Sequence, residues 1–118
     1  MQRSNLMILK ELLLDLAFFV IGIIAMTQLY AHNIVVLLIM VAMWVIGIIF
    51  WHTRHDIIFF VVSAIIGATT EIIVIPFGTW HYANPSFLNI PIWLPFAWGI
   101  ALMLAKRVAE VIIRVEQR

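Results

Sequence analysis

The feature that most constrains this chain is a series of four apolar runs, at about residues 12–31, 34–51, 57–76 and 91–112. Within the third run the single charged residue is Glu71. About 20 apolar residues suffice to cross the hydrocarbon core of a bilayer as a helix. The runs are too long and unbroken for the strands of a membrane barrel. We therefore predict an all-α integral membrane protein, a four-transmembrane-helix antiparallel bundle with short connections.

Composition supports this class and excludes several others. The chain has 118 residues, of which 65% are apolar and 11% charged. A soluble domain is roughly 45–50% apolar and ~25% charged, and a short soluble chain cannot hide so much apolar surface. A soluble enzyme, a nucleic-acid-binding protein and a disordered chain are therefore excluded. We predict a single membrane domain over residues 1–118. The absence of cysteine excludes disulfides and thiolate chemistry.

The distribution of basic residues predicts the orientation. All seven Lys and Arg lie on one side of the four-span arrangement. Arg3 and Lys10 precede the first run, and Arg54 lies between the second and third. The other four follow Ala105, where the apolar part of the last run ends. The outward loop at residues 77–90 has none. The positive-inside rule then predicts a multi-pass protein of the cell (inner) membrane with both termini cytoplasmic. A short cytoplasmic helical tail to residue 118 is expected, lying on the membrane surface or docking a cytoplasmic partner.

Glu71 is the first candidate site residue. With a rise of ~1.5 Å per residue it lies about 21 Å from the cytoplasmic end of its span. Ala64, Gly67 and Ala68 share its helical face, and small residues favour close packing against another helix. An ionisable residue at this depth is a functional candidate by default, so we predict that Glu71 is a catalytic acid or a proton carrier. The alternative is a structural hydrogen bond, with Thr27, Gln28, Trp80 or Tyr82 as its partner.

The other candidate site residues surround the outward loop. The predicted ligand-binding residues are Trp80, His81, Tyr82, Asn89, Trp93 and Trp98. For the Trp and Tyr side chains, an aromatic belt at the membrane interface is the alternative. Trp98 lies deeper than a belt residue needs to be, and its indole N–H requires a partner at the height of Glu71. Asn89 lies in a segment that is typical of a turn.

Two further polar features have structural explanations. Asp15 lies about one turn into the first span and is expected to pair with Lys106 or Arg107, with a relay role as the alternative. Glu71 is about 16 Å higher by helical rise, too far for the two carboxyl groups to share a site. His52 and His55 have a metal-like spacing but no further ligand nearby, so we predict no metal and no cofactor.

Residues 67–98 resemble part of the membrane family of carotenoid biosynthesis proteins that includes the carotenoid hydratases. The resemblance rests on Glu71 within a span, on Phe77-Gly78-x-Trp80-x-Tyr82 and on Pro91-x-Trp93-x-Pro95. Members of that family are longer and have more spans. The resemblance implies an isoprenoid ligand, an acid that protonates a double bond, and aromatic faces that stabilise a carbocation.

Three hypotheses of function follow. The first is a site around Glu71 that binds or modifies a lipid-like ligand, such as an isoprenoid or a carotenoid. The second is a small proton-coupled multidrug-type transporter, which its carboxylate in the third rather than the first span weakens. The third is a non-catalytic accessory subunit of a larger membrane complex, or a homo-oligomer. Besides the bilayer, the expected partners are therefore an apolar ligand or another membrane protein, and whether the chain is an enzyme stays open.

Overall fold

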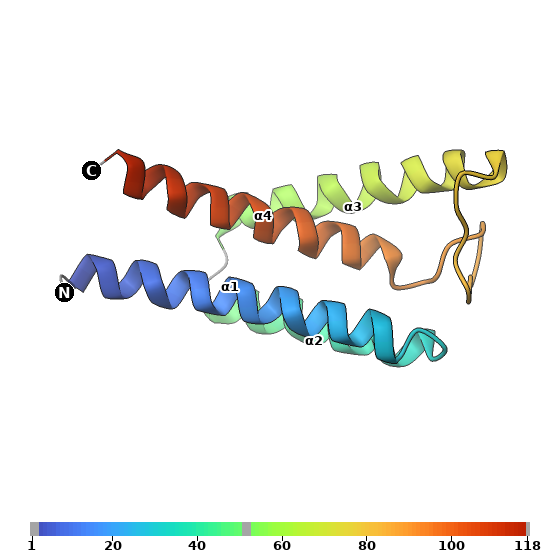
Figure 1. The fold of residues 1–118 in the computed structure, drawn as a ribbon, viewed down its shortest axis with the longest axis horizontal. Coiled ribbons are helices and arrows are strands. Elements are labelled where there is room, and N and C mark those ends of the chain that lie inside the picture. The colour runs from blue at the N-terminus through green and yellow to red at the C-terminus, as the bar shows by residue number, and fades with distance from the viewer. Residues whose placement is uncertain (1–2, 51–52, 118) are drawn as a thin grey trace.

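The fold is a bundle of antiparallel helices. The computed structural model describes residues 3–50 and 53–117. Its helices are α1 (Arg3–Gln28), α2 (Asn33–Phe50), α3 (Arg54–Val74) and α4 (Leu94–Glu116), and a 3₁₀ turn, η1 (Ile75–Phe77), follows α3. The start of α1 and the end of α4 lie at one end of the bundle, and the loop between η1 and α4 lies at the other (Figure 1).

The predicted all-helical class is confirmed for the described residues. Over these residues the single β pairing is an isolated bridge between Phe87 and Ile90 in the loop. Two helical segments, Asn33–Phe50 and Arg54–Phe77, are long and apolar enough to cross a membrane. These segments correspond to the second and third predicted spans, although Trp51 at the end of the second lies outside the described residues.

The first and last helices differ in length from the predicted runs. α1 begins at Arg3, well before residue 12, and Glu11 in its third turn forms an ion pair with Arg107 of α4. α4 begins at Leu94 rather than residue 91 and continues unbroken to Glu116. The expected helical tail is therefore part of α4, except for residue 118, which lies outside the described residues.

Local sequence explains both ends of α3. Thr53 is its N-cap: the Thr53 hydroxyl accepts from the Asp56 amide, and the Asp56 carboxylate accepts from the Thr53 amide. Such a capping box satisfies two backbone donors that a helix start leaves unpaired. At the other end Pro76 lies in η1, and Gly78 adopts a left-handed φ of 83°. This conformation suits glycine and turns the chain back over the end of α3.

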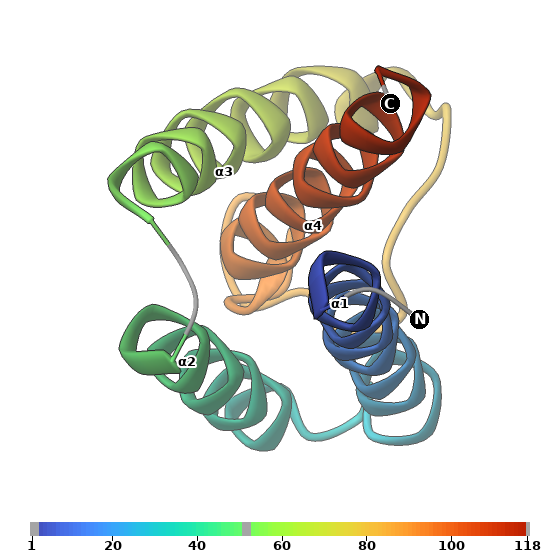
Figure 2. The same cartoon turned by 90° about the vertical axis from the view of Figure 1, so that its left-hand side faces the viewer.

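Glycine brings α3 and α4 into close contact. A Cβ on Gly67 would lie 2.2 Å from Cδ2 of Trp98, and a Cβ on Gly99 would lie 2.6 Å from Cδ2 of Phe60. Each helix therefore offers a glycine to an aromatic ring of the other, as expected for small residues at membrane helix contacts. Figure 2 shows α4 between α3 and α1. α4 therefore packs against each of the three other long helices.

Candidate functional site

Glu71 lies in the last turn of α3 and its side chain accepts hydrogen bonds from three aromatic residues. The carboxylate oxygen Oε1 accepts from Trp80 Nε1 at 3.0 Å and from the Tyr82 hydroxyl at 2.5 Å. The other oxygen, Oε2, accepts from Trp98 Nε1 at 2.5 Å. Glu71 is only 4% exposed. The candidate residues Glu71, Trp80, Tyr82 and Trp98 therefore form one cluster, which we call the Glu71 site.

Different parts of the chain supply the three donors. Trp98 comes from the second turn of α4, where the absence of a side chain on Gly67 lets its ring lie against α3. Gly67 precedes Glu71 by one helical turn, so the same contact directs the indole N–H toward the carboxylate. Trp80 and Tyr82 come from the loop that follows Gly78. The alternative that Glu71 forms a hydrogen bond to Trp80 or Tyr82 is thus also present in the structure.

Trp93 lies next to the Glu71 site and contacts Tyr82. Its ring packs edge-on against Tyr82, with 6.2 Å between the ring centroids, and it is buried. Its indole Nε1 donates to Oδ1 of Asn33 at 3.0 Å. Asn33 in turn donates to the Asn84 carbonyl at 2.7 Å and to the Ser86 hydroxyl at 2.8 Å. The sequence did not predict that Asn33 binds the loop at residues 77–90. The one signal for it was a polar amide at the start of an apolar run.

His81 and Asn89 are not brought into the Glu71 site. Both residues are exposed, and among the residues that the structure describes neither forms a hydrogen bond with Glu71. Asn89 and Leu88 both have positive φ, 67° and 47°, as in a tight turn. The sequence pattern had indicated a turn for Asn89, and the structure has one there.

The donors define what the carboxyl group can do. An ionised carboxylate accepts only, with about four lone-pair positions on its two oxygens. The three neighbours occupy three of them and leave one on Oε2. The two indole N–H groups can only donate, whereas the Tyr82 hydroxyl can also accept. Three donors therefore converge on the carboxyl group of Glu71, and its remaining acceptor position can bind a fourth.

Tyr82 is expected to make stability depend on pH. Burial, with the hydrogen bond to Glu71, raises the pKa of the Tyr82 phenol above its ordinary value of 10.0. As the pH rises, the unfolded chain then loses this proton before the folded one does. The temperature of unfolding should hold below pH 10 and fall above it, measured by circular dichroism in detergent. The unfolding temperature of Tyr82→Phe, which has no phenol, should fall less over the same pH range. An equal fall in both proteins would show that Tyr82 is not the cause.

A second polar cluster lies at the opposite end of the bundle. The Arg107 guanidinium donates to Asp15 Oδ1 at 3.3 Å, to Asp56 Oδ2 at 2.5 Å and to Glu11 Oε1 at 3.0 Å. Asp15 and Asp56 are each 1% exposed and Arg107 is 6% exposed. Lys106 also binds Asp56, at 3.0 Å. The expected pairing of Asp15 with Arg107 is confirmed, whereas Glu11 and Asp56 were not predicted as partners of Arg107.

The described residues contain no candidate metal centre. Within residues 3–50 and 53–117, no group of three or more His, Cys, Asp or Glu side chains could hold a metal ion. His52, which gave the metal-like spacing with His55, lies outside the described residues. The acids around Arg107, which we call the Arg107 cluster, bind basic side chains, and Glu71 binds aromatic donors.

No protein-family model, curated protein or solved structure matches the chain.

Proposed function

We propose that this chain is a four-span protein of the cell membrane that binds a lipid-like ligand at its outward end, through the carboxylate of Glu71. The observation that carries the proposal is the buried carboxylate with three aromatic donors and one unoccupied acceptor position. The ligand is an apolar molecule whose head group donates a hydrogen bond to Oε2 of Glu71. Binding, rather than proton donation, is the role that this donor set favours.

Helix length and surface chemistry support four spans. At ~1.5 Å per residue the 26 residues of α1 and the 23 residues of α4 extend about 39 and 34 Å, against ~30 Å of hydrocarbon. The surface of the bundle carries large exposed apolar side chains, among them Val20 and Ile24 of α1, Leu38 and Ile49 of α2, and Ile65 and Ile66 of α3. In water such a surface would aggregate, whereas in a bilayer it faces lipid.

The proposed orientation has both termini in the cytoplasm and is testable by cysteine labelling. The chain has no cysteine of its own, so a single introduced thiol reports one position. Ala83→Cys in the exposed part of the loop should react in intact cells with a maleimide that cannot cross the membrane. Glu116→Cys, in the last turn of α4, should react only after the cells are permeabilised. The reverse pattern, or reaction of both thiols in intact cells, would contradict this topology.

The residues around Glu71 favour an apolar ligand. Trp80 is 42% exposed although its N–H is bound to Glu71, so the ring of Trp80 forms the outer wall of the site. Phe77, three residues earlier in the chain, is 84% exposed. Aromatic side chains at the membrane interface pack well against molecules that have an apolar body and a polar end. The resemblance of residues 67–98 to carotenoid biosynthesis proteins favours an isoprenoid with a hydroxyl head group.

Bound-lipid analysis tests this proposal. The wild-type protein and Glu71→Gln are purified from the same membranes, and their lipids are extracted and identified by mass spectrometry. We expect a lipid with a donor head group to be enriched over bulk membrane lipid in the wild type. Replacing one carboxylate oxygen by an amide NH₂ puts a donor where an acceptor is needed. The loss of a charge-assisted hydrogen bond, about 1.5–3 kcal/mol, should reduce the bound amount by about tenfold or more.

The matched control is Glu110→Gln, the same change at an exposed position in the last turns of α4. This control should retain the wild-type amount of bound lipid. The thermal unfolding of each variant in detergent is measured in parallel, so that lost ligand is compared among folded proteins. Equal lipid content in all three proteins, or no lipid enriched over the bulk membrane in the wild type, would refute the proposed function.

A further inference from the structure

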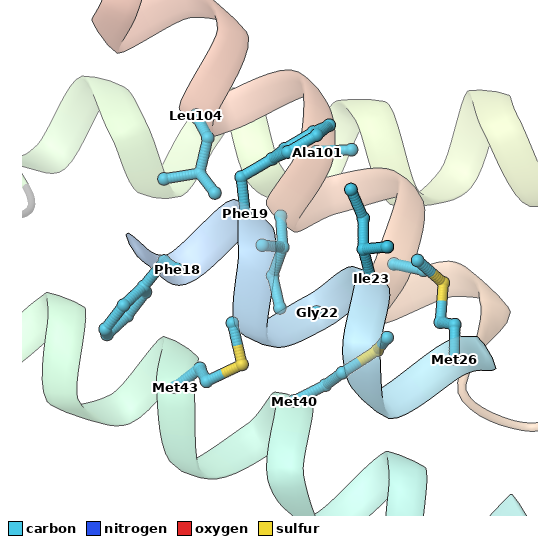
Figure 3. A pocket seen from close by; sticks show the side chains of 11 residues that line it. Phe18, Phe19, Gly22, Ile23, Met26, Met40, Met43, Ala101 and Leu104 are labelled. Carbon is cyan, nitrogen blue, oxygen red and sulfur yellow. The ribbon is translucent and has the colours of Figure 1, made fainter. Parts of the chain in front are cut away.

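An apolar pocket lies between α1, α2 and α4. It is a cavity with a volume of about 120 Å³ that is partly open to the surface of the bundle, and two of its lining residues, Phe19 and Ile23, are exposed. Phe18, Phe19, Gly22, Ile23 and Met26 of α1 line it together with Met40 and Met43 of α2 and Ala97, Ile100, Ala101 and Leu104 of α4. The close-up in Figure 3 shows side chains of α1, α2 and α4 converging on this space.

The residues that line the cavity identify the kind of molecule that can fill it. Every lining side chain is apolar, and a stable buried water needs two to four polar partners. An apolar cavity of roughly this size in other proteins stays dry and binds small hydrocarbons. Water is therefore a poor occupant, and a hydrocarbon group is a good one.

The space exists because α4 and α1 both carry small residues where they face the cavity. Ala97 and Ala101 lie one turn apart on α4, and a Cβ on Gly22 of α1 would approach the Met43 side chain no closer than 4.0 Å. Met26, Met40 and Met43 form much of the opposite wall. Methionine side chains are flexible and polarisable, so they adapt to chains of different shape. The lining is thus suited to a flexible hydrocarbon chain more than to a rigid head group.

We infer that the end of a phospholipid acyl chain occupies this cavity in the membrane. The lining residues lie in the middle and outward parts of the helices, where acyl chains are the surrounding solvent of a four-span protein. The inferred site shares no residue with the Glu71 site. It lies where α4 packs against α1 and α2, whereas Trp98 packs against α3.

Photochemical cross-linking tests this inference. The protein is placed in nanodiscs that contain a phosphatidylcholine with a diazirine near the end of one acyl chain, irradiated, digested and mapped by mass spectrometry. Cross-links should be enriched at Met26, Met40 and Met43 over exposed apolar residues such as Leu38. Ala101→Leu fills the cavity with further methylene groups. Displacing about two CH₂ groups of the acyl chain should lower labelling of these methionines by about tenfold.

Ala42→Leu is the matched control, because Ala42 is exposed on α2 and does not line the cavity. This variant should keep the labelling pattern of the wild type. Ala101→Leu is expected to unfold at the wild-type temperature or above, since it fills a void. If it does not fold, Gly22→Ala adds one methyl group to the same wall and should reduce labelling partially. Labelling of the three methionines no stronger than that of exposed residues, or unchanged by filling variants that fold, would overturn the inference.

Discussion

Replacing Arg107 by alanine is expected to lower the free energy of unfolding by about 3–5 kcal/mol. The guanidinium binds Asp15, Asp56 and Glu11, and both aspartates are almost fully buried. Without Arg107, Asp15 loses the guanidinium, and Asp56 retains Lys106 and the Thr53 amide. An uncompensated buried charge costs far more than a surface ion pair contributes. The loss is measured as unfolding in detergent, by heat or by increasing denaturant, followed by helical circular dichroism.

A nearby arginine provides the matched control. Arg114 pairs with Glu11 at 2.8 Å, but its side chain is 52% exposed. Arg114→Ala should therefore cost no more than about 1 kcal/mol. Adding Asp15→Asn and Asp56→Asn to Arg107→Ala removes the stranded charges and should restore part of the loss. If Arg107→Ala lowered the free energy of unfolding no more than Arg114→Ala, the Arg107 cluster would not stabilise the bundle.

Replacing Glu71 by alanine is the other change with a large expected effect, about 2–5 kcal/mol. It leaves three donors without their acceptor, on Trp80, Tyr82 and Trp98. Each buried donor that loses its partner costs about 1–3 kcal/mol. Trp80 is half-exposed and can turn its N–H to water, so Tyr82 and Trp98 account for most of the loss. Thermal unfolding in detergent gives the size of the effect.

A double-mutant cycle separates this loss from general damage to packing. Trp98→Phe removes one donor while keeping an aromatic ring against Gly67. It should cost about 1.5–3 kcal/mol in the wild type, because the bond is to a charged group. In the Glu71→Ala background it should cost less, since the donor there is already unpaired. Equal costs in both backgrounds would mean that Trp98 and Glu71 do not interact energetically.

Much of the Glu71 site could be predicted from the sequence, because the rise of a helix fixes how far along the bundle each residue lies. A constant rise per residue puts Glu71 and Trp98 at similar heights on neighbouring helices. At that depth an indole N–H and a carboxylate each need a partner, so their meeting follows from elementary chemistry. The same counting separates Asp15 from Glu71, and the structure has Asp15 at the Arg107 cluster.

The path of the outward loop could not be predicted in this way. His81 lies between Trp80 and Tyr82 in sequence but is exposed, because the direction of a loop side chain depends on local φ and ψ. The role of Asn33 depends on contacts with Asn84 and Ser86, more than fifty residues later in the chain. The length of α1 was underestimated because apolar runs ignore charged residues that pair in the folded protein.

The central position of α4 has a consequence for how the protein is made. A chain is synthesised from its N-terminus, so in the proposed four-span topology α1 and α3 enter the membrane before α4 exists. Until then Asp15 lacks Arg107, Asp56 lacks both of its basic partners, and Glu71 lacks Trp98. Helices inserted singly associate afterwards through packing and polar contacts. A nascent intermediate that stops short of α4 would thus carry three acids without the partners that α4 supplies, and this distinguishes an unfinished molecule from a finished one.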